Sequence, residues 1–167
     1  MNLYRGCSHG CIYCDSRSSC YQLPHAFEDI EIKKNALVLL EEALRRKRKK
    51  CMIGTGSMTD PYIPLETELG SVRRAMELVY KYGCGFTLLT KSNRILRDLD
   101  LLQKINASAK CVVQMTLTTY DEELCKKIEP YVSTTRERFE ALKQLRDAGI
   151  PTVVWLCLLY TSPSPRD

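Results

Sequence analysis

Long apolar runs are missing from this sequence. No window holds the roughly 18 consecutive apolar residues that a membrane-spanning helix needs. The first residues lack the apolar core of a secretory signal. No internal repeat and, apart from the tail, no low-complexity segment is visible. We therefore expect a cytoplasmic globular protein without a membrane partner.

The composition limits the size and the partners. With 167 residues the chain has the length of one domain and can bury a core. The formal net charge of +5 is a mild basic excess, compatible with a nucleic-acid partner without demanding one. The basic run 45–50 follows a predicted helix, where the helix dipole favours cations. We interpret this run as a solvated helix end, with contact to DNA or RNA as the alternative.

Cysteine is abundant and unevenly placed. Of the nine cysteines, Cys7, Cys11, Cys14 and Cys20 crowd into one short segment. The other five are scattered through apolar stretches, where a cysteine usually behaves as a small hydrophobic residue. Without an export signal, reduced thiols and a metal-binding role are favoured over a disulfide framework.

Both ends of the chain are unusual. The tail CLLYTSPSPRD, residues 157–167, contains a Ser-Pro-Ser-Pro run that can continue neither a helix nor a strand. It resembles the translation of a sequencing adapter, so we expect a native domain over residues 1–156 and a non-native tail; a natural disordered tail is the alternative. Because Met1 stands so close before Cys7, we expect it to be an internal methionine of a longer protein.

Short apolar segments alternate with amphipathic ones along the chain. Strands are predicted at residues 51–54, 86–90, 111–117 and 152–156, after a first short strand before Cys7. Helices are predicted between them from leucine and valine at helical spacing, and Thr134 with Glu137 forms a capping-box pattern. This order indicates an α/β fold with a parallel sheet and outer helices. Function then gathers at the carboxyl ends of the strands.

The segment Gly6 to Cys14, which we call the cysteine loop, carries the strongest chemical signal. Cys7, Cys11 and Cys14 stand at spacings of four and three, and the loop glycines let the sulfurs converge. Thiolates are soft ligands for iron–sulfur clusters or zinc. Three of them leave one iron of a four-iron cluster free for a substrate or cofactor. A structural zinc site, with His9 or Cys20 as fourth ligand, is the alternative.

The octapeptide CSHGCIYC resembles the CxxxCxΦC signature of the radical S-adenosylmethionine (SAM) superfamily, with Tyr13 at the aromatic position. The resemblance implies a [4Fe–4S] cluster on the three cysteines, SAM chelating the fourth iron, and Tyr13 near the adenine. It implies reductive cleavage of SAM to a 5′-deoxyadenosyl radical that abstracts hydrogen from a substrate. It also implies a partial (βα) barrel, here truncated after about the fifth strand.

Within that superfamily the stretch GSMTDPYIPLE resembles the spore photoproduct lyase-like branch, which is related to DNA repair photolyases. The resemblance assigns Thr59 and Asp60 to the SAM amino group, and Lys91 and Thr116 to its carboxylate. On the residues alone, the first pair lies in a Gly-rich turn and the lysine is a solvated strand end. Glu66 and Arg94 lie on the same predicted face, and we assign them no role.

The resemblance covers Asn2 to Leu156. It implies an electron donor such as a flavodoxin or a ferredoxin, and it leaves open a nucleic-acid substrate. True spore photoproduct lyases carry an additional cysteine as hydrogen donor where this chain has Ser57. Cys84 or Cys111 could replace it only by facing the cleft. The competing function is a non-catalytic, zinc-stabilised binding module.

Overall fold

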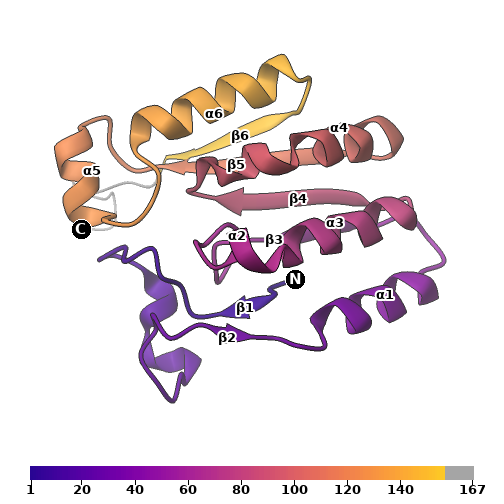
Figure 1. The fold of residues 1–167 in the computed structure, drawn as a ribbon, viewed down its shortest axis with the longest axis horizontal. Coiled ribbons are helices and arrows are strands. Elements are labelled where there is room, and N and C mark those ends of the chain that lie inside the picture. The colour runs from indigo at the N-terminus through magenta and orange to yellow at the C-terminus, as the bar shows by residue number, and fades with distance from the viewer. Residues whose placement is uncertain (157–167) are drawn as a thin grey trace, which may run out of the picture.

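The computed structural model describes residues 1–156. The predicted tail, residues 157–167, lies outside this range. The described chain forms a two-stranded antiparallel sheet and a four-stranded parallel sheet with helices along it (Figure 1). The strands are β1 (Tyr4–Arg5), β2 (Glu31–Ile32), β3 (Met52–Thr55), β4 (Gly85–Thr90), β5 (Cys111–Leu117) and β6 (Thr152–Leu156). The α-helices are α1 (Ala36–Arg46), α2 (Glu66–Leu69), α3 (Ser71–Lys81), α4 (Leu99–Ser108), α5 (Glu122–Ile128) and α6 (Thr135–Asp147), with shorter 3-10 turns between some of them.

The parallel sheet has the strand order β3-β4-β5-β6. Helix α3 packs between α1 and α4, and α6 packs against β5 and β6 (Figure 1). Side chains of β4 and β5 that face these helices, such as Phe86, Leu88 and Val113, are fully buried. The alternating residues are only partly buried, and two of them, Thr87 and Gln114, are joined by a hydrogen bond of 2.9 Å. The predicted α/β fold is confirmed, but the sheet has one covered face and one partly open face.

The first strand differs from the prediction. Its two residues pair antiparallel with β2 and do not join the parallel sheet. Gly6 follows it directly at φ +86°, a left-handed conformation that turns the chain out of the strand. The described chain therefore has four parallel strands, where the sequence pattern suggested five.

The helix predicted between the strands at 51–54 and 86–90 begins after Gly70, as α3, and a short helix α2 precedes it. Gly70 has φ +59°, so α2 ends there and α3 begins at the next residue. The carboxylate of Glu66 accepts hydrogen bonds from the N–H groups of Ser71 and Val72 at 3.1 and 3.0 Å and pairs with Arg97 at 2.9 Å. These hydrogen bonds make the fully buried Glu66 side chain a cap of α3, which is a structural role.

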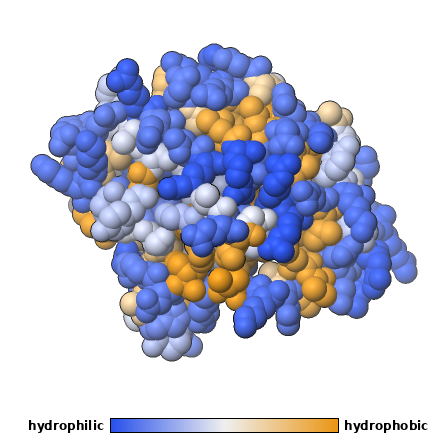
Figure 2. All heavy atoms as spheres, viewed as in Figure 1, coloured by the Kyte–Doolittle hydropathy of each residue, from blue (hydrophilic) through white to orange (hydrophobic). Residues whose placement is uncertain are grey.

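The helix beginning at Thr135 has the predicted capping box. Thr134 accepts from the N–H of Glu137, and the Glu137 side chain accepts from the N–H of Thr134. Across residues 1–156, none of the helices has both the length and the apolar character that crossing a bilayer requires. On the face seen in Figure 2, a mostly hydrophilic surface is interrupted by separate apolar patches.

Candidate cluster and cofactor site

The cysteine loop leaves β1 and curls against the end of α5. A Cβ at Gly6 would lie 2.5 Å from the carbonyl oxygen of Phe27, so only glycine fits there. The N–H of Cys7 donates to that same oxygen at 2.9 Å. Further along, the N–H of Ile12 donates to the carbonyl of Ile128 at 3.0 Å. The loop is therefore held by backbone contacts on both sides of its cysteines.

The loop faces the ends of β3, β4 and β5 across a cavity of about 90 Å³, which we call the cysteine cavity. Seven of the eight predicted site residues line it: Cys7, Cys11, Cys14, Thr59, Asp60, Lys91 and Thr116. The eighth, Tyr13, lies beside it, with the Lys91 Nζ atom 5.6 Å from the centre of its ring. The structure thus brings together residues that the sequence places far apart.

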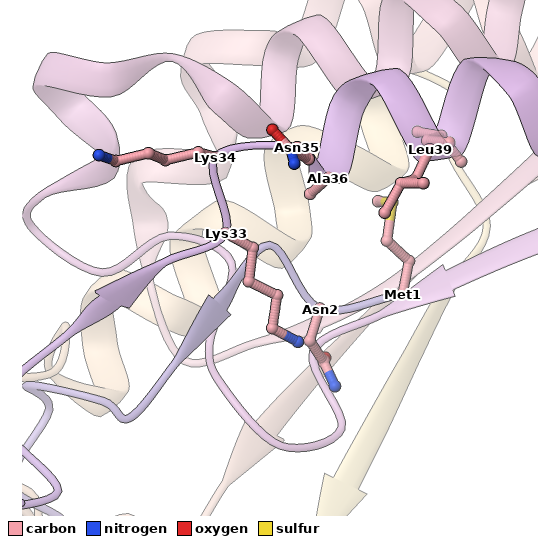
Figure 3. A pocket seen from close by; sticks show the side chains of 8 residues that line it. Met1, Asn2, Lys33, Lys34, Asn35, Ala36 and Leu39 are labelled. Carbon is pink, nitrogen blue, oxygen red and sulfur yellow. The ribbon is translucent and has the colours of Figure 1, made fainter.

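A larger hollow, of about 590 Å³, lies between the N-terminus and the start of α1 (Figure 3). Met1, Asn2, Ala36 and Leu39 line it together with two lysines, and most of its surface is apolar. Size alone would favour this hollow as the functional site. It holds no cysteine and no carboxylate, so the convergent polar chemistry belongs to the smaller cysteine cavity.

The three thiols line the same cavity, and burial desolvates two of them, Cys7 and Cys11. Burial raises the pKa of Cys7. Burial also raises the pKa of Cys11 to about 12; the Lys91 cation opposes this rise, whereas negative charge on Glu129, Cys7 and Cys14 adds to it. A metal ligand must be a thiolate, so cluster binding would release these protons. Lys91 is the cation placed to compensate the resulting negative charge.

The sulfur donors of the cysteine loop bear on the choice between a cluster and a single metal ion. Within residues 1–156, no three His, Cys, Asp or Glu side chains are grouped tightly enough to hold one metal ion. A structural zinc site needs four ligands at about 2.0–2.3 Å from a single centre. In a [4Fe–4S] cluster each thiolate binds a different iron, so three cysteines would leave one iron free for another ligand. The three thiols that line the cysteine cavity are the ligand set that such a cluster would use.

Asp60 is occupied by the protein's own donors. One carboxylate oxygen accepts from the N–H of Tyr62 at 2.8 Å and the hydroxyl of Thr90 at 2.7 Å. The other accepts from the N–H of Lys91 at 2.7 Å and lies 3.4 Å from His9 Nδ1. A carboxylate offers about four lone-pair sites, and the three hydrogen bonds use three of them, with His9 close to the carboxylate as well. Asp60 thus ties the β3 loop to the end of β4 and to the cysteine loop.

His9 also lines the cysteine cavity, and the structure gives it a place that the sequence did not. Its side chain is 2% exposed, and its Nε2 atom has no hydrogen-bond partner within residues 1–156. Burial lowers its pKa, and the nearby carboxylate of Asp60 acts in the opposite direction. A buried polar atom without a partner costs free energy, so a bound group that satisfies Nε2 would be stabilised.

Tyr13 is fixed by a buried ion pair behind the cavity. Its hydroxyl donates to the carboxylate of Glu129 and lies 3.1 Å from the hydroxyl of Thr118. Glu129 in turn pairs with Arg138 at 2.6 Å, and both side chains are fully buried. Arg138 also donates to the carbonyl of Thr116 at 2.7 Å. This network holds the aromatic ring of the loop against the end of β5.

The ion pair of Glu129 and Arg138 determines which groups of this network are charged. Burial pushes the pKa of Glu129 upward, but Arg138 and the hydroxyls of Tyr13 and Thr118 outweigh it, and the net pKa is lowered. Burial and the Glu129 carboxylate both raise the pKa of Tyr13. Tyr13 therefore stays a neutral donor beside an ionised carboxylate.

Several other residues receive a definite place. The hydroxyl of Thr59 donates to the carbonyl of Tyr4 at 3.4 Å, within the cavity wall. Arg94 bonds the hydroxyl of Ser92 at 3.3 Å and does not line the cavity. Cys84 precedes β4 and Cys111 begins β5. Both therefore lie at the amino ends of the strands, whereas the cavity lies at the carboxyl ends. Neither takes the position of the missing hydrogen-donor cysteine.

Sequence reasoning missed four residues of the site. Thr90, next to Lys91, was not singled out as a partner of Asp60, and His9 was considered only as a zinc ligand. Glu129 and Arg138 carry no local signal, because their pairing depends on how α5 and α6 pack. The only signal in the sequence was the spacing of Arg138, which places it on the same helix face as Leu142 and Leu145 and so predicts that it is buried.

The sequence matches the family model of the radical SAM superfamily over residues 1–162. This chain belongs to the radical SAM superfamily. An uncharacterized protein of Methanocaldococcus jannaschii is 30% identical over 158 residues, covering 93% of this chain and 58% of that protein. An uncharacterized protein of Mycobacterium tuberculosis is 29% identical over 161 residues, covering 90% of this chain and 46% of the other. The chain thus spans about half the length of these relatives.

Solved structures of spore photoproduct lyase share the fold. One variant superimposes with a TM-score of 0.73 at 15% identity, covering 98% of this chain and 46% of the other. A second, with bound AdoMet and dinucleoside spore photoproduct, has a TM-score of 0.72 at 16% identity, over 97% of this chain and 46% of the other. The predicted partial barrel of the radical SAM type is therefore confirmed as a fold.

Proposed function

We propose that this chain forms the cofactor-binding part of a radical SAM enzyme, with a [4Fe–4S] cluster on Cys7, Cys11 and Cys14. When bound, the cluster and SAM together supply a 5′-deoxyadenosyl radical that abstracts hydrogen from a substrate. The observation that carries the proposal is the single cavity shared by these cysteines with Thr59, Asp60, Lys91 and Thr116. Family membership supports the same chemistry.

Each residue has a task that follows from its surroundings. Lys91 supplies a cation for the carboxylate of SAM, and the hydroxyl of Thr116 stands at the end of the adjacent strand. Asp60 accepts from the backbone N–H of Lys91 and so positions that cation, in addition to lying where the SAM amino group would bind. Because Asp60 has little free capacity, His9 and Thr59 are the better candidates for direct contact with the SAM amino group. Tyr13, held by Glu129, offers its ring to the adenine.

The substrate and the partners are further parts of the proposal. A one-electron reduction requires a donor, and we propose a flavodoxin or a ferredoxin in the cytoplasm. The dinucleoside bound to the structural neighbour makes a nucleic acid the first substrate class to test. Ser57 lines the cavity where spore photoproduct lyases carry a cysteine, so repair of thymine photoproducts is not part of the proposal.

Metal analysis of the anaerobically reconstituted protein tests the function. We expect about four irons and four sulfides per chain, with the broad visible absorption of an iron–sulfur cluster. Addition of SAM should change the electron paramagnetic resonance spectrum of the reduced cluster. Zinc as the sole bound metal, with no iron–sulfide absorption, would support the zinc-stabilised binding module instead.

A further inference from the structure

Two cysteines lie side by side at the amino ends of the parallel strands, whereas the cysteine cavity lies at the carboxyl ends. Cys51 immediately precedes β3, and Cys84 immediately precedes the neighbouring strand β4. Their sulfur atoms are 3.1 Å apart, although the residues are 33 positions apart in the chain. The proposed function uses neither residue.

The backbone holds this pair in register. The first ladder partners of the two strands are Met52 and Gly85, so Cys51 and Cys84 are the next pair along. The N–H of Gly85 donates to the carbonyl of Cys51 at 2.8 Å. Neighbouring strands are about 4.8 Å apart, and a disulfide needs Cα atoms roughly 4.4–6.8 Å apart. A covalent bond here would thus require little movement of the sheet.

The two sulfurs differ in access. Cys51 is partly exposed, whereas Cys84 is 3% exposed and belongs to the core. An oxidant in solution therefore reaches Cys51 first, and Cys84 is placed to react with the product. Cys111 is also a buried, free cysteine at the amino end of a neighbouring strand, so it offers a matched comparison.

We propose that Cys51 and Cys84 are an oxidisable dithiol, a modification site that a hydroperoxide closes to a disulfide. The Cys51 thiolate attacks the O–O bond of hydrogen peroxide, giving a sulfenic acid and hydroxide, which takes up the released thiol proton as water. The Cys84 sulfur then attacks the sulfenic sulfur, the S–O bond breaks, and a second water leaves. In total, two thiols lose two hydrogens and one peroxide is reduced to two waters.

The test uses the full chain in the cluster-free state. The protein is treated with equimolar hydrogen peroxide, free thiols are alkylated, and the chain is digested without reduction for mass spectrometry. We expect the Cys51–Cys84 peptide pair, lighter by two hydrogens, in several-fold higher yield than any other cysteine pair. Dithiothreitol should return both residues to the alkylated form. Oxidation in guanidinium should give mixed pairings, because the sheet no longer selects partners.

Two sets of variants separate this inference from the proposed function. A chain with alanine at Cys7, Cys11 and Cys14 has no cluster ligands, and it should still form the crosslink. Cys111→Ala should form it as well, whereas Cys51→Ser should leave Cys84 fully alkylated. Recovery of Cys51 and Cys84 as free thiols, while other cysteines of the folded chain are oxidised, would overturn the inference. So would pairing of either residue with another cysteine in equal yield.

Discussion

The carboxylate of Asp60 accepts a hydrogen bond from the backbone N–H of Lys91, at 2.7 Å. The contact joins the loop after β3 to the end of β4, and it places the Lys91 side chain above the ring of Tyr13. The residue proposed to neutralise the SAM carboxylate is therefore positioned through its backbone by a second site residue.

Asp60→Ala should disturb both stability and SAM binding. It leaves the Thr90 hydroxyl and the Lys91 amide without their acceptor, and losing a hydrogen bond to a charged group costs about 1.5–3 kcal/mol. Thermal unfolding of the cluster-free chain and SAM affinity of the loaded protein measure the two effects. Asp100→Ala, which removes an exposed carboxylate paired with Arg73, is the control and should leave SAM affinity unchanged. Equal SAM affinity in Asp60→Ala and the wild type would contradict the positioning role.

Lys91→Ala should weaken SAM binding while iron content stays the same. A charge-assisted contact of about 1.5–3 kcal/mol corresponds to an affinity loss of roughly ten- to hundredfold. Equilibrium binding of SAM to the reconstituted protein gives the affinity, and iron analysis gives the cluster content. Lys81→Ala, at an exposed ion pair with Glu41, serves as the comparison. An unchanged dissociation constant would remove Lys91 from the site.

Cys11→Ala should abolish cluster binding and SAM cleavage together, because no other thiol lines the cavity besides Cys7 and Cys14 among the described residues. Cys20→Ala is a matched control from the same segment, since Cys20 is exposed and does not line the cavity. The control should keep full iron content. Formation of 5′-deoxyadenosine by Cys11→Ala would refute the cluster assignment.

Two substitutions of His9 separate its two nitrogens. An asparagine side chain reaches as far as Nδ1 and can keep the contact with Asp60, whereas a glutamine reaches as far as Nε2. If Nε2 contacts the bound SAM, His9→Gln should bind SAM several-fold more tightly than His9→Asn at equal iron content. If His9 serves only to hold Asp60, the order is reversed. Isothermal titration of both reconstituted variants decides between the two results.

Arg138→Met should destabilise the fold by about 3–5 kcal/mol, because it leaves the Glu129 carboxylate buried without its cation. The wild-type pair also predicts a pH effect of definite sign. Since the folded-state pKa of Glu129 is lowered, its stabilisation is complete above the unfolded value of about 4.3 and is lost as pH falls through the folded-state value.

Denaturant unfolding of the cluster-free chain between pH 3 and pH 7 checks this assignment. Glu129→Gln should show a smaller loss of stability on acidification than the wild type, because the group that takes up the proton is gone. The double variant Glu129→Gln, Arg138→Met should recover part of the stability that Arg138→Met loses. Identical acid profiles for Glu129→Gln and the wild type would show that the pair contributes nothing to the pH dependence.

Much of the architecture could be predicted from the sequence, because periodicity reports which face of each element is buried. The strands that became β3 to β6 and the capping box of Thr134 and Glu137 were predicted in this way. The break at Gly70 was not, since the apolar spacing from Leu69 to Val79 continues across it. The antiparallel pairing of β1 with β2 was missed because it joins two-residue segments that have no periodicity.

For the site, the cysteine signature and the strand ends identified seven residues that line one cavity. The hydrogen bonds and ion pairs among these residues depend on tertiary distances, which a local sequence pattern does not contain. Asp60 was predicted to bind the SAM amino group, and only the structure shows that Tyr62, Thr90 and Lys91 already use most of its capacity. The pair of Glu129 and Arg138 depends likewise on tertiary packing.

The loop after β3 crosses the end of β4 at Gly56, which has φ +98° and where a Cβ would lie 2.0 Å from the carbonyl oxygen of Leu89. The next residue, Ser57, lines the cavity. This contact excludes any side chain at position 56. At position 57 the side chain faces the cavity, so it can be replaced without a change of the backbone. A Ser57→Cys substitution would thus place a thiol in the cavity wall without any change of the backbone at Gly56.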